Sequence, residues 1–105
     1  MQIQFNSDRN IEGDEAMTRF VESVVHGALD RFSEQITRVE IHVRDENSDK
    51  KGGNDDIRCL MEARLAGLQP VAVSHNAASL EEAVDGSAGK MQRSLESTLG
   101  RLNQR

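Results

Sequence analysis

The chain has 105 residues, of which 36% are hydrophobic and 30% charged, a balance typical of a globular domain rather than a disordered or membrane-spanning chain. Its formal net charge is −5, from 13 Lys and Arg against 18 Asp and Glu, which argues against a protein that binds nucleic acid through an overall positive charge. The chain has no signal-peptide pattern and no apolar run near the roughly 20 residues that cross a bilayer. It has a single cysteine, which fits a reducing compartment. We therefore expect one cytoplasmic domain over residues 1–105 that does not contact a membrane.

The first half of the chain alternates between strand and helix patterns. Residues 1–7 place Ile3 and Phe5 on one side of a half-buried strand. Asp14 is suited to cap a helix, and residues 36–45 alternate again, which predicts a second strand. The helix between them has its apolar residues at helical spacing. These residues are Met17, Phe20, Val21, Val24, Ala28 and Phe32.

The second half predicts two more strands and a long helix. A polar stretch over residues 45–56 predicts a hairpin loop, and alternation over residues 57–66 and 71–76 predicts the strands. Ser79 with Glu82 three positions later forms a capping box, the signature of a helix start. The apolar stripe of that helix contains Leu80, Val84, Ala88, Met91, Leu95, Thr98 and Leu102.

These elements predict an α+β fold with the order β-α-β-β-β-α. Because each strand has one polar side and each helix one apolar stripe, we expect a four-stranded sheet with both helices packed on one face. Cys59 should point toward this core. The expected core residues are Ile3, Phe5, Phe20, Val24, Val39, Ile41, Val43, Met61 and Leu95.

The residues that usually carry chemistry do not form a catalytic or metal-binding constellation. His26, His42 and His75 lie in three different predicted elements, without the spacing of a metal site. Cys59 lies on the inner side of its strand and His42 on the outer side of its own, so they are not predicted to pair as nucleophile and base. We therefore expect no enzymatic activity, no cofactor, no metal and no small-molecule substrate.

Two predicted surfaces are cationic. On the long helix, Lys90, Arg93 and Arg101 fall in one narrow sector beside the apolar stripe. The outer face of the sheet carries four arginines interspersed with Glu40 and Glu62, and no phenylalanine, tyrosine or tryptophan on which a base would stack. These arginines are Arg38, Arg44, Arg58 and Arg64.

Both helices resemble those of the hibernation promoting factor family, also known as the sigma-54 modulation or protein Y family. The segment Ala16–Phe32 is similar to the family's first helix, and Ser79–Leu95 is similar to its second. The resemblance spans nearly the whole chain and includes the order and number of the elements. The second-helix residues in register with the family are Ala83, Val84, Asp85, Lys90, Met91, Arg93 and Leu95.

The resemblance implies a non-enzymatic factor of the short form, which binds the small ribosomal subunit in the channel used by messenger and transfer RNA and blocks translation during stress. In this chain, the residues expected to contact ribosomal RNA are Lys90, Arg93 and Arg101, together with Lys50 and Lys51 in the predicted loop.

An alternative follows from the departures from the family pattern. Family members carry basic residues on the first helix where this chain has Val24, Gly27 and Asp30, and a tyrosine near the start of the second helix where it has Glu81. With a net charge of −5, these differences favour a second hypothesis, a protein-interaction module that keeps the fold without binding RNA.

Overall fold

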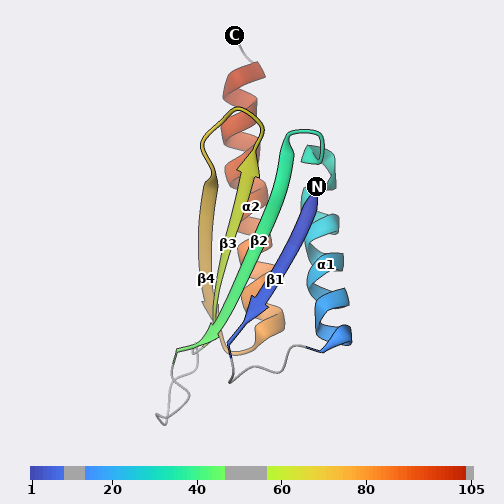
Figure 1. Ribbon diagram of the computed structural model, residues 1–105. Helices are drawn as coiled ribbons and strands as arrows, with labels where there is room; N and C mark the ends of the chain where they lie inside the picture. The colour runs from blue at the N-terminus through green and yellow to red at the C-terminus, as the bar shows by residue number, and fades with distance from the viewer. Residues whose placement is uncertain (9–13, 47–56, 104–105) are drawn as a thin grey trace.

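The computed structural model of the chain describes residues 1–8, 14–46 and 57–103. Its elements have the predicted order β-α-β-β-β-α, with a short 3-10 turn after the first helix (Figure 1). They are β1 (Gln2–Ser7), α1 (Glu15–Leu29), η1 (Asp30–Phe32), β2 (Ile36–Asp45), β3 (Ile57–Leu65), β4 (Val71–Ala77) and α2 (Leu80–Asn103).

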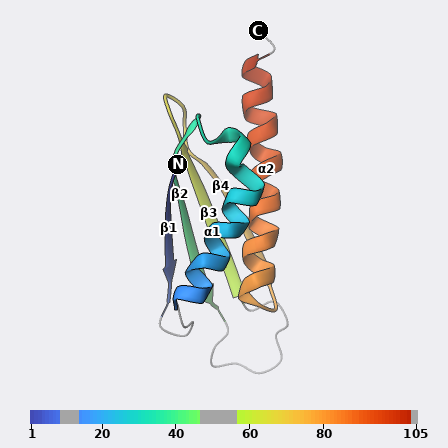
Figure 2. The same cartoon turned by 90° about the vertical axis from the view of Figure 1, so that its right-hand side faces the viewer.

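The four strands form one mixed sheet in the order β1-β2-β3-β4. β1 pairs with β2 in parallel, because α1 carries the chain back before β2 begins, and the other two pairs are antiparallel. Both helices lie on the same face of this sheet, as predicted, and leave the other face open (Figure 2). β1 and β4 are the edge strands.

The start of α1 is fixed by Asp14, whose Oδ1 accepts a hydrogen bond from the Met17 N–H at 2.8 Å, as the sequence predicts. The residues of α1 that are fully buried are Val21, Val25 and Leu29. The periodicity of the sequence predicts that the buried side of this helix is centred near Val24, about one position from the observed centre at Val25. The apolar stripe of α1 is wide enough to allow either rotation, and contact with α2 and the sheet selects the observed one.

Of the nine residues expected in the core, five are fully buried and four are partly buried. Val39, Ile41, Val43, Met61 and Leu95 are at most 1% exposed. Ile3, Phe5, Phe20 and Val24 are half-buried and pack at the border of the core, which corrects the prediction. Ile3 and Phe5 belong to the edge strand β1, which has a neighbouring strand on one side only.

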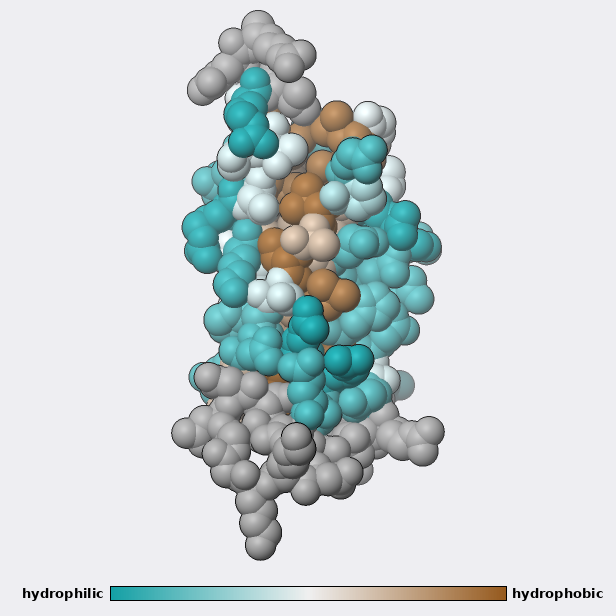
Figure 3. All heavy atoms as spheres, turned by 90° about the vertical axis from the view of Figure 1, so that its left-hand side faces the viewer, coloured by the Kyte–Doolittle hydropathy of each residue, from teal (hydrophilic) through white to brown (hydrophobic). Residues whose placement is uncertain are grey.

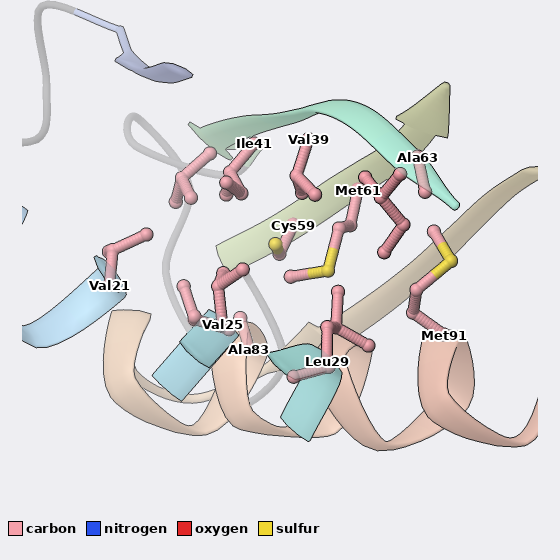
Figure 4. Packing of buried hydrophobic residues seen from close by; sticks show 14 of the residues in the cluster. Val21, Val25, Leu29, Val39, Ile41, Cys59, Met61, Ala63, Ala83 and Met91 are labelled. Carbon is pink, nitrogen blue, oxygen red and sulfur yellow. The ribbon is translucent and has the colours of Figure 1, made fainter. Parts of the chain in front are cut away.

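Cys59 lies in the centre of the core, among the residues drawn in Figure 4. It is 0% exposed, and burial raises the pKa of its thiol, so it behaves as a small apolar side chain. The nearby Ser87 is also fully buried, and its hydroxyl donates to the Cys59 carbonyl oxygen at 3.1 Å. This bond joins α2 to β3 in the interior.

Candidate nucleic-acid interface

The rotation of α2 about its axis decides which of its residues face solvent. At its start, the Ser79 hydroxyl accepts from the Glu82 N–H at 3.2 Å, which confirms Ser79 as the N-cap of the predicted capping box, and it donates to the Glu82 carboxylate at 3.1 Å. The apolar stripe then packs against β3, β4 and α1. Its buried residues are Leu80, Ala83, Val84, Ala88, Met91 and Leu95.

Lys90, Arg93 and Arg101 lie beside this stripe with exposed side chains. Lys90 Nζ donates to the Ser74 carbonyl oxygen of β4 at 2.9 Å, and Arg101 Nη1 donates to Ser97 Oγ at 3.2 Å. Within residues 1–8, 14–46 and 57–103, none of the three cations pairs with a carboxylate. Their charge is therefore not neutralised by the part of the chain that the structure describes.

The edge strand β4 lies beside α2 and closes one side of the molecule. Viewed from this side, hydrophobic residues form a strip between two hydrophilic flanks (Figure 3). Val71 and Val73 of β4 and Leu99 of α2 are half-buried hydrophobic residues that pack against the core. The bond from Lys90 satisfies one backbone carbonyl of this strand and holds the ammonium group close to the sheet edge.

The arginines on the open face of the sheet differ from the α2 cations because each has a carboxylate partner. The pairs are Arg38–Glu40, Arg64–Glu40, Arg64–Glu62, Arg44–Glu46 and Arg58–Glu46, with N–O distances between 2.8 and 3.8 Å. Arg19 of α1 pairs with Glu15 at 3.7 Å, and Arg31 of η1 pairs with Glu96 of α2. Among the described cations, the least compensated charge is on α2.

Two of these carboxylates have perturbed acidity. Hydrogen bonds from Arg64 and then Arg38 lower the pKa of Glu40 below its ordinary value of 4.5. Hydrogen bonds from Asn76 and then Arg44 lower the pKa of Glu46 in the same way. Both carboxylates are therefore ionised at neutral pH and hold the sheet arginines in place.

This lowered pKa predicts that part of the stability is lost in acid. A group whose folded-state pKa is depressed contributes stability above its unfolded value and loses it as pH falls through the folded value. We expect Glu40→Gln to have a lower thermal midpoint than the wild type at neutral pH, and the difference to close as pH falls below about 4.5. A difference that stays constant from neutral to acidic pH would contradict the role of Glu40.

The two other residues predicted to contact RNA, Lys50 and Lys51, lie outside the described residues, with the rest of the predicted loop between β2 and β3. His26, His42 and His75 come from α1, β2 and β4, and the described part of the chain contains no cluster of side chains suited to a metal ion. No helix within the described ranges is both long and apolar enough to cross a membrane.

The open face of the sheet also has a shallow pocket that sequence reasoning missed. It is lined by His42, Arg44, Arg58 and Leu60, with a volume of about 310 Å³. Alternation had already placed both arginines on this face. That they stand directly opposite each other follows from the register of β2 and β3, which the sequence does not reveal.

Comparison with solved structures defines the class of fold. The chain is similar to the crystal structure of the Thermus thermophilus Protein Y N-terminal domain, with a TM-score of 0.73 and 21% identity over 93% of this chain and 99% of that one. It is similar to a ribosomal subunit interface protein from Coxiella burnetii, with a TM-score of 0.73 and 14% identity over 95% of this chain and 99% of that one. The protein therefore has the α+β fold of these domains.

The sequence also matches a protein family directly. The profile of the Sigma 54 modulation protein / S30EA ribosomal protein family matches residues 3–103, and the chain belongs to this family. This confirms the resemblance seen in the two helices. Comparison with curated proteins gives no significant match.

Proposed function

We propose that this protein is a non-enzymatic, cytoplasmic factor that associates with the ribosome, binds ribosomal RNA of the small subunit and inhibits translation. Membership of the S30EA ribosomal protein family and structural similarity to a ribosomal subunit interface protein support the association. The observation that carries the RNA contact is the set of three exposed cations on α2 without a carboxylate partner in the described chain.

Lys90, Arg93 and Arg101 suit phosphate groups better than base edges. They are exposed along one helix, and no aromatic side chain accompanies them on this stripe. Such cations bind RNA by displacing counterions from the phosphate backbone, which gives affinity without sequence specificity. Lys50 and Lys51 would add two contacts from the loop that the structure does not describe. The overall charge of −5 keeps this affinity modest.

The salt dependence of binding tests this proposal. Each phosphate contact contributes about −0.7 to −0.9 to the slope of log affinity against log salt, so three contacts predict a slope of roughly −2 to −3. If Lys50 and Lys51 also bind phosphates, the slope steepens to roughly −4. Cosedimentation with purified small subunits at a series of salt concentrations measures it. Binding that does not respond to salt would contradict phosphate contacts.

A second candidate function is a protein-interaction module without RNA affinity. The observation that favours it is the surface of α1, where Gly27 and Asp30 provide no cation and Arg19 is paired with Glu15. This candidate predicts no cosedimentation with small subunits even at low salt, so the same experiment separates the two functions.

A further inference from the structure

The pocket on the open face of the sheet lies on the opposite side from the two helices. The described residues that line it belong to β2 and β3 and form two neighbouring rows. One row contains Arg44 and Arg58, and the other contains His42 and Leu60. We propose that this pocket binds one nucleotide, with the phosphate between Arg44 and Arg58 and the base against His42 and Leu60. This site is separate from the cations of α2 and goes beyond the proposed function.

The register of β2 and β3 creates this arrangement. Arg44 stands opposite Arg58, and two positions along, His42 stands opposite Leu60. Opposed residues in an antiparallel pair have Cβ atoms about 5 Å apart, and the guanidinium groups of Arg44 and Arg58 both approach Glu46 Oε2, at 3.2 and 3.8 Å. The next row on the same face is roughly 7 Å away along the strands. This spacing suits a ligand with an anionic group at one end and a flat, less polar group at the other.

Among the residues that the structure describes, the charge on this face is uneven, with more cations per carboxylate at the pocket than at the other end. At the other end of the sheet, Arg38 and Arg64 have two carboxylates, Glu40 and Glu62. At the pocket, the one carboxylate in the described part of the chain that pairs with Arg44 and Arg58 is that of Glu46, at 3.2 and 3.8 Å. Like charges directly opposite on a sheet destabilise it. A second anion at this point would relieve that repulsion.

The other row of the pocket suits a nucleobase. Leu60 is 37% exposed, one of two large hydrophobic residues exposed in the described part of the chain. The partly exposed imidazole of His42 next to it, whose Nε2 lies 3.5 Å from Glu40 Oε1, is a surface on which bases stack, as are the guanidinium planes of arginine. Asn6 Nδ2 lies 3.5 Å from His42 Nδ1 and borders the ring from β1. The volume of about 310 Å³ is at the small end of ligand sites, which fits a single nucleotide.

A ligand with this chemistry has two sources: it is either an unstacked nucleotide of an RNA strand or a free nucleotide. The test is an NMR titration of the isotope-labelled protein with uridine monophosphate, inorganic phosphate and a four-nucleotide uridine RNA. We expect uridine monophosphate to shift the amide resonances of the four pocket residues, and inorganic phosphate to bind several-fold more weakly. Tighter binding of the RNA than of the monophosphate assigns the site to RNA, and equal affinity assigns it to free nucleotides.

Three variants and a matched control connect the binding to the proposed contacts. Arg44→Gln removes one charge-assisted contact and should weaken nucleotide binding about tenfold. Leu60→Ala should weaken uridine monophosphate but not inorganic phosphate. Glu46→Gln removes the competing carboxylate and should tighten binding several-fold. Arg38→Gln, on the same face but beside Glu40, should leave it unchanged.

Inorganic phosphate binding as tightly as the monophosphate, or equal losses in Arg38→Gln and Arg44→Gln, would overturn the nucleotide site. So would the absence of shifts at the pocket with both the monophosphate and the RNA. The titration contains no ribosome, so its failure leaves the proposed function untouched. Failure of ribosome cosedimentation, in turn, leaves the titration interpretable.

Discussion

Replacing Lys90, Arg93 and Arg101 together by glutamate is expected to abolish cosedimentation with the small ribosomal subunit. The triple variant loses three charge-assisted contacts and places three negative charges against RNA phosphates. A hydrogen bond to a charged group contributes about 1.5–3 kcal/mol, so the affinity should fall at least about a hundredfold even if the contacts are only partly additive. Sedimentation at low salt, where the wild type binds best, gives the clearest measurement.

The same variant should remain folded, because the three side chains are exposed and lie outside the core. Loss of the Lys90 bond to Ser74 should lower the thermal midpoint only slightly, since exposed polar contacts contribute little. Reversal of Arg38 and Arg64, sheet arginines that do not line the nucleotide pocket, is the control and should affect ribosome binding less. If ribosome binding survives the helix reversal and is lost with the sheet reversal, the interface is on the sheet.

Those features of the fold that depend on local pattern could be predicted from the sequence. Val39, Ile41 and Val43 alternate with charged residues, and a strand with one buried side follows directly from that period. Asp14 and Ser79 mark the two helix starts because their side chains satisfy backbone N–H groups that the first helical turn leaves unpaired. The sector of α2 that carries the cations follows from helical geometry alone.

The features that depend on distant parts of the chain could not be predicted. Glu46 directly follows β2 in sequence, yet one oxygen of its carboxylate is shared by Arg44 and by Arg58 of β3, and its other oxygen accepts from Asn76 of β4. Only the register of three strands brings these groups together. The sequence shows four arginines on the sheet and three cations on α2, but not which set is already neutralised.

Gly86 is a second case in which tertiary contact overrides a local rule. Glycine inside a helix is normally less favourable than alanine by up to about 1 kcal/mol, so alanine at this position should stabilise the protein if only α2 mattered. His75 of β4, however, lies directly against Gly86. A Cβ atom at this position would be 2.7 Å from His75 Cγ and closer still to Cδ2 and Nε2. The ring cannot clear that space by a rotation of its far end alone.

Gly86→Ala is therefore expected to destabilise the protein, by about 1–3 kcal/mol, the usual cost of overpacking. Gly27→Ala and Gly100→Ala are the matched controls, because nothing lies within 4 Å of a Cβ at either position, and both should stabilise. Urea unfolding of the three variants measures the free energies.

The contact with His75 is tested by repeating Gly86→Ala in a His75→Ala background. Removing the ring frees the space that the new methyl group needs, so the helix preference for alanine should then dominate and the substitution should become stabilising. The sign of the effect therefore depends on a residue eleven positions away in another element. If Gly86→Ala destabilises both backgrounds equally, the ring is not the cause, and the substitution acts through the backbone of α2 instead.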